Sequence, residues 1–136
     1  LKEFCNHLGF SDEDLENSMI AIEGFVLEHW EQLAYLQDKQ EYHRVSEHFI
    51  ARVSKIAERN KSRLIKEIQN SEDVMELLKK ARTEELTHEE SERIRQELII
   101  ILKTVPTFVI ISLPQRFLTL PILMKILPKN LFSEGH

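Results

Sequence analysis

Apolar residues recur along the first part of the chain at alternating steps of four and three. This spacing places them on one face of a helix. The series, in which His29 counts as nearly apolar, is Leu15, Met19, Ile22, Val26, His29, Leu33 and Leu36. Ser11 precedes three acidic residues, the pattern of an N-cap and an acidic first turn. We therefore expect one helix from Ser11 to about Gln37.

A second apolar series predicts a long amphipathic helix with a polar interruption near Asn60. Its members are Tyr42, Val45, Phe49, Val53, Ile56, Leu64 and Ile68. Asn70 and Ser71 form a break, after which a short helix is expected over residues 72–82. Thr87 and Glu90 make a capping box, which predicts a new helix that ends or kinks at Pro106. Because no strand-like alternation is present, the predicted class is all-α, a bundle of amphipathic helices.

The C-terminal part of the chain, residues 98–132, is almost entirely apolar. Prolines divide it at intervals of roughly two helical turns, which predicts a proline-kinked apolar helical hairpin. They are Pro106, Pro114, Pro121 and Pro128. Residues 105–127 would measure about 35 Å if helical, enough for a bilayer core. A straight span would bury Arg116 near its middle, and inserting this arginine would cost about 2.5 to 3.5 kcal/mol of free energy.

Three arrangements of this apolar segment therefore remain open. It enters the membrane as a hairpin that turns at Gln115 and Arg116, it lies in the interface, or it packs inside a soluble bundle. In the interfacial arrangement, four cations would reach the lipid head groups. They are Lys103, Arg116, Lys125 and Lys129.

Charge is unevenly distributed in this chain, whose net charge is −5. After Glu97 those four cations face a single acidic residue, Glu134, whereas the preceding part is acidic. An acidic body argues against nucleic-acid binding, while a cationic apolar tail suits an anionic lipid surface. The single cysteine, Cys5, permits no internal disulfide and favours a reducing compartment. Because the chain begins at Leu1, we treat it as part of a longer protein.

The proline spacing at the C-terminal end resembles that of the LETM family, the leucine zipper and EF-hand containing transmembrane proteins, and their bacterial relatives. The resemblance covers about residues 86–133. The matching elements are Leu86-Thr87, Leu102-Lys103-Thr104-Val105-Pro106, Pro114, Leu120-Pro121, Lys125 and Leu127-Pro128-Lys129-Asn130-Leu131-Phe132-Ser133. Two departures stand out: Gln115, Arg116 and Thr119 occupy a region where mitochondrial members tend to carry an acid, and the chain lacks the large domain that follows in such proteins.

The resemblance implies a membrane-associated module that acts in cation/proton exchange and in ion or volume homeostasis. It also implies a ribosome or another protein as partner, and a location at the mitochondrial inner membrane or, in a bacterium, at the cell membrane or peripherally in the cytoplasm. Residues 1–85 would form an acidic amphipathic region and residues 86–136 the LETM-like segment. The alternative is a soluble helical scaffold that buries the tail and binds proteins, with self-association through its amphipathic helices.

Candidate sites for metals or catalysis are weak. Asp12, Asp14, Glu16 and Glu23 superficially fit a calcium loop, but its sixth position needs Gly and carries Asn17. The pair His43 and Glu47 is most simply an i,i+4 surface contact, and His29 is most simply a residue at the edge of the core. Glu85 and His88 lie on either side of the Thr87 cap, so they do not share one continuous helical face. Without a phosphate loop, nucleophile elbow or paired catalytic carboxylates, we expect no enzyme and no cofactor.

Overall fold

The computed structural model describes residues 11–33 and 39–128, and these residues form helices without strands, which confirms the all-α class. The helices are α2 (Asp12–Glu28), α3 (Trp30–Leu33), α4 (Lys39–Arg59), α5 (Lys61–Asn70), α6 (Glu72–Thr83), α7 (His88–Leu102), α8 (Pro106–Ile110) and α9 (Leu120–Ile126).

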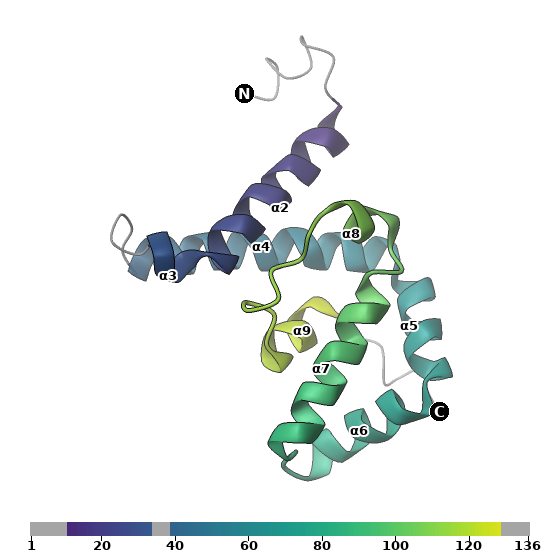
Figure 1. Ribbon diagram of the computed structural model, residues 1–136. Coiled ribbons are helices and arrows are strands. Elements are labelled where there is room, and N and C mark those ends of the chain that lie inside the picture. Colours follow the sequence, from purple (N-terminus) through teal and green to yellow (C-terminus); the bar gives the residue numbers. More distant parts are fainter. Residues whose placement is uncertain (1–10, 34–38, 129–136) are drawn as a thin grey trace.

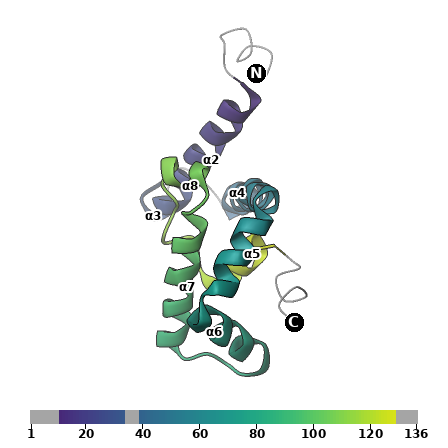
Figure 2. The ribbon, with the colours of Figure 1, turned by 90° about the vertical axis from the view of Figure 1, so that its right-hand side faces the viewer.

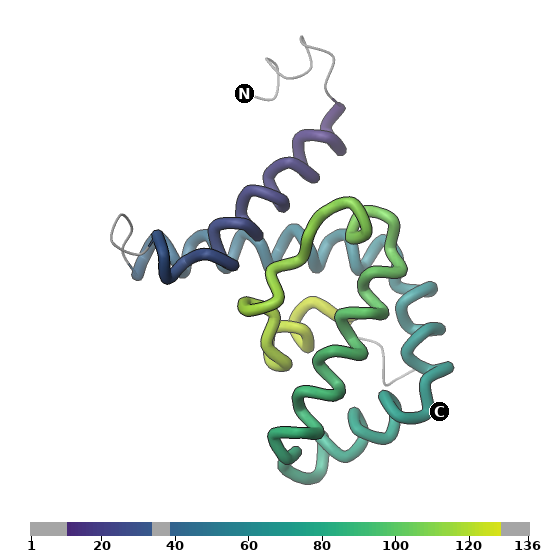
Figure 3. The backbone as a smooth tube through the Cα atoms, in the orientation of Figure 1, coloured from purple at the N-terminus to yellow at the C-terminus, as the bar shows by residue number. Residues whose placement is uncertain are grey.

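Helix α4 runs across the molecule and the other elements are arranged around it (Figure 1). Helix α2 packs on α4 with its C-terminal half, while its N-terminal half projects from the body (Figure 3). Helices α5, α6 and α7 pack on one another below α4, and α9 lies in contact with both α4 and α7. The view turned by 90° shows α8 near α2, at the opposite end of α7 from α6 (Figure 2).

Between residues 39 and 102 the predicted helices and the breaks between them agree with the structure, although the last of these helices ends at Leu102, before Pro106. The α4 and α5 helices are separated at Asn60, whose amide Nδ2 donates to the Ile56 carbonyl at 2.8 Å. The Ser71 hydroxyl caps α6 by accepting from the Val74 amide. The Thr87 capping box is present in full, so local side-chain chemistry determines where these helices begin.

The prediction of one continuous N-terminal helix to Gln37 is wrong, because α2 ends at Glu28 and α3 follows His29. Its predicted apolar face is also displaced. The face of α2 that packs inward carries Ile20, Glu23, Gly24 and Leu27, whereas Ile22 is 61% exposed. The Tyr35 and Leu36 positions of the predicted helix lie outside the described residues.

The displacement follows from the contact between α2 and α4. Gly24 permits the close approach, since a Cβ atom there would lie 3.3 Å from Cε1 of Phe49 and 3.5 Å from Cδ of Pro114. Glu23 is buried because its carboxylate accepts from Nε of Arg52 at 3.0 Å. A paired carboxylate and a glycine thus occupy core positions that hydrophobicity alone assigns to the surface.

Much of the apolar C-terminal segment packs against the helical body. After the end of α7, and apart from prolines, its buried hydrophobic residues are Val105, Phe108, Ile111, Leu113, Phe117, Leu118, Leu123, Ile126 and Leu127. The ring of Phe117 meets that of Phe49 edge to face, with centroids 5.6 Å apart. Among the described residues, none of the helices is both long and apolar enough to span a bilayer.

Candidate functional site

The four prolines punctuate the apolar segment at its element boundaries. Pro106 and Pro121 lie in the first turns of α8 and α9, where the missing N–H costs no helical hydrogen bond. Pro114 is buried in the connection between these helices, next to Gly24 of α2, and Pro128 is buried after α9. The prolines therefore begin or separate short helices rather than kink a continuous one.

The connection between α8 and α9 makes a turn at residues 115–117, and side chains from two helices hold it there. Nη1 of Arg95 on α7 donates to the carbonyls of Gln115 at 3.1 Å and of Leu118 at 3.3 Å. From the other side, the Glu28 carboxylate of α2 accepts from the Arg116 amide at 2.9 Å. The turn is thus fixed between α2 and α7.

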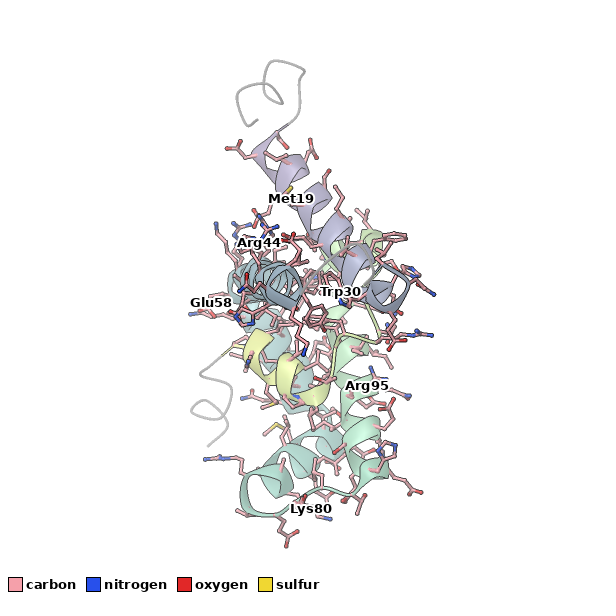
Figure 4. The ribbon with its side chains drawn as sticks, turned by 90° about the vertical axis from the view of Figure 1, so that its left-hand side faces the viewer. Met19, Trp30, Arg44, Glu58, Lys80 and Arg95 are labelled. Atoms are coloured by element: carbon pink, nitrogen blue, oxygen red, sulfur yellow. The ribbon has the colours of Figure 1, made fainter. Side chains whose placement is uncertain are left out.

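Arg95 is itself oriented by a carboxylate on its own helix. Its Nε donates to Glu92 at 3.0 Å, and this hydrogen bond lowers the pKa of the Glu92 carboxyl and raises the pKa of the Arg95 guanidinium. Both groups therefore stay charged across the physiological range. Figure 4 shows Arg95 on α7 at the level of α9. Sequence reasoning missed Arg95 and Glu28, because their partners lie far away in the sequence.

The predicted membrane-interface cations do not form one cluster. Lys103 caps α7, Arg116 lies in the turn and Lys125 in the last turn of α9, and all three are exposed. Lys129 lies outside the described residues. Lys103 borders the exposed side chains of Val109 and Ile110, in a hollow of about 400 Å³ formed with residues 108–113 and Gln115.

We call this surface the α8 corner and define it by Ile100, Lys103, Val109 and Ile110. The three apolar side chains are 58%, 69% and 86% exposed, respectively. Ile100 precedes Lys103 by one helical turn, so the two lie on one face of α7. No acidic residue lines the hollow between Lys103 and α8. Arg63 on α5 brings a second cation close to Lys103. Its Nη1 donates to the carbonyl of Thr104, the residue that follows Lys103, at 3.0 Å.

A second exposed apolar surface lies on α2, where Ile22 is 61% and Phe25 62% exposed. We call these two residues the α2 strip. The Phe25 ring packs against the imidazole of His29 with centroids 4.5 Å apart. This strip lies near the connection between α8 and α9, since Phe25 lines a hollow together with Ser112, Leu113 and Pro114.

The residues weighed as metal or calcium ligands all lie within the described part of the chain. Within the described ranges, no three His, Cys, Asp or Glu residues gather to hold a metal ion. Asp12 and Asp14 open α2 behind the Ser11 cap, and His43 lies 3.9 Å from Glu47 as an exposed i,i+4 pair. Trp30 is half-buried and meets the Tyr42 ring edge to face at 4.8 Å.

Comparison of the chain with known protein families, curated proteins and solved structures gives no match.

Proposed function

We propose that the chain is a membrane-associated helical module that touches an anionic lipid surface through the α8 corner. The observation that carries the proposal is the exposure of Val109 and Ile110 beside Lys103, within a segment that has no acidic residue between Leu98 and Pro128. Most apolar side chains of this segment pack inward, yet α8 presents two of them outward, and they are the two most exposed. A cation beside exposed apolar residues is the arrangement that binds lipid interfaces.

The expected strength of this contact follows from the residues that it would bury. Val109 and Ile110 each contribute about 1.5 to 3 kcal/mol on full transfer from water, and a cation near an anionic surface about 1 kcal/mol. These gains are offset by the entropy lost on association. The contact is therefore weak and reversible, and it depends on anionic lipid and on ionic strength.

Replacing Val109 and Ile110 together with Ser tests the proposal directly. We expect the wild-type protein to co-sediment with vesicles that contain phosphatidylserine and to do so less with purely zwitterionic vesicles. The double substitution should reduce the partition coefficient at least tenfold, since it removes the apolar part of the contact. The matched control replaces the equally apolar α2 strip, Ile22→Ser with Phe25→Ser, and should bind vesicles as the wild type does.

Equal vesicle binding by the two double variants would refute the role of the α8 corner. Failure of the wild-type protein to bind anionic vesicles at low salt would refute the membrane proposal as a whole. Because all four substituted side chains are more than half exposed, both variants should keep the urea midpoint of the wild type within a small margin.

The resemblance to the LETM family places this contact, as part of the proposal, in a protein of cation/proton exchange and membrane ion or volume homeostasis. The acidic helices would then lie at the membrane surface as a platform, with a protein partner such as a ribosome on their outer face. This wider role depends on parts of such proteins beyond the present chain.

A second candidate, a protein-interaction scaffold, is favoured by the α2 strip. Ile22 and Phe25 lie on the face of α2 that points away from the protein core, where a second copy of the chain can pack helix against helix. Sedimentation equilibrium should then show a dimer that Phe25→Ser dissociates. A monomer at all concentrations would rule out this mode of self-association.

A further inference from the structure

A cleft of about 600 Å³ opens between α7, the turn at residues 115–117 and the start of α9. It is separate from the α8 corner, although Gln115 borders the hollows on both sides. Its volume lies within the range of about 300–1,000 Å³ that is usual for small-molecule sites. The cleft therefore has room for a ligand of moderate size.

The polar rim of the cleft offers hydrogen-bond donors that have no partner among the described residues. They are the guanidinium of Arg116 and the hydroxyls of Ser91 and Thr119, whose side chains form no hydrogen bond or ion pair there. The one carboxylate in the lining, Glu92, is already bound by Arg95 and by the amide of Gln96. The uncommitted groups thus favour an anion over a cation.

The floor of the cleft is apolar and belongs mainly to α9. Leu118 is fully buried beneath it, Leu120 is half-buried, and Met124 is 39% exposed although Leu123 beside it packs inward. An exposed methionine beside a leucine is a surface that adapts to alkyl chains of varying shape. The rim suits an anionic group and the floor suits an alkyl chain, so the cleft matches a molecule that carries both.

We propose that this cleft binds a single-chain anionic amphiphile, with its carboxylate or phosphate head at Arg116, Ser91 and Thr119 and its alkyl chain against Leu120 and Met124. The site is distinct from the membrane contact at the α8 corner and does not depend on it. Its ligand is a dispersed molecule rather than a bilayer surface.

The methyl resonance of Met124 in the full chain, followed by NMR during titration, tests this assignment. Decanoate and decyl phosphate, each below its micelle concentration, should shift this resonance in a saturable way and leave that of Met75, on α6, in place. Inorganic phosphate and decanol should bind at least tenfold more weakly, because each lacks one half of the recognised structure. The relative affinities of decanoate and decyl phosphate identify the preferred head group.

Arg116→Gln should weaken binding of both amphiphiles about tenfold, since it removes a charged hydrogen bond. Lys125→Gln, which removes an exposed cation of α9 that does not line the cleft, should leave affinity unchanged. Replacement of Val109 and Ile110 with Ser should also leave it unchanged, which separates this site from the α8 corner.

Several results would overturn the assignment. A Met124 resonance that neither amphiphile shifts excludes the site. If decanol binds as tightly as decanoate, the cleft recognises only the alkyl chain. If inorganic phosphate binds as tightly as decyl phosphate, the cleft recognises only the anionic group. Equal weakening by Arg116→Gln and Lys125→Gln shows that only net charge matters.

Discussion

Phe49→Ala should lower the free energy of unfolding by about 3–5 kcal/mol, the range for removing a fully buried aromatic side chain. Phe49 is 0% exposed. Its ring lies where three parts of the fold meet: it belongs to α4, packs under Gly24 of α2 and contacts Phe117 of the apolar segment. The expected loss is a large part of the total stability of a domain of this size. Urea denaturation followed by circular dichroism measures it.

Phe25→Ala is the matched control for this prediction. It removes the same side chain from a position that is 62% exposed, so the urea midpoint should change little. If Phe49→Ala cost less than about 1 kcal/mol, the junction of α2, α4 and the apolar segment described above would be wrong.

Leu123→Ala should lower the free energy of unfolding by about 2–5 kcal/mol, because it creates a cavity between α9 and its neighbours. Leu123 is 0% exposed on a helix that packs against both α4 and α7. The adjacent Met124 is 39% exposed, so Met124→Ala should cost clearly less. Similar small losses for the two variants, in the same urea experiment, would show that α9 does not pack between these helices.

The sequence predicts the elements from α4 to α7 well because their apolar series are flanked by charged residues. The alternation of apolar and charged residues marks the helical period in the sequence, and the polar residues Asn60, Ser71 and Thr87 mark the breaks between helices. The apolar pattern predicts the wrong face of α2, because two of the core residues of this helix, Glu23 and Gly24, are not apolar. Only a partner helix that supplies Arg52 and Phe49 makes these positions internal, and that partner is not visible in the local pattern.

The arrangement of the apolar segment cannot be read from its sequence for a different reason. Apolar residues occupy nearly every position there, so period and face are not marked. Its path depends instead on Arg95 and Glu28, which bind backbone groups 20 to 88 positions away in the sequence. The exposure of Val109 and Ile110, on which the proposed function depends, likewise appears only once the neighbouring residues are seen to be buried.

The central claim is that the α8 corner meets the membrane while the rest of the apolar segment stays packed in the protein. Quenching of tryptophan fluorescence by brominated lipids in anionic vesicles tests this claim. Trp30, the one tryptophan of the chain, is replaced with Phe, and a single tryptophan is introduced by either Ile110→Trp or Phe117→Trp. We expect bromines near the glycerol region to quench tryptophan at position 110 and to leave tryptophan at position 117 unquenched. Quenching at both positions by bromines near the chain ends, or at neither position, would contradict the claim.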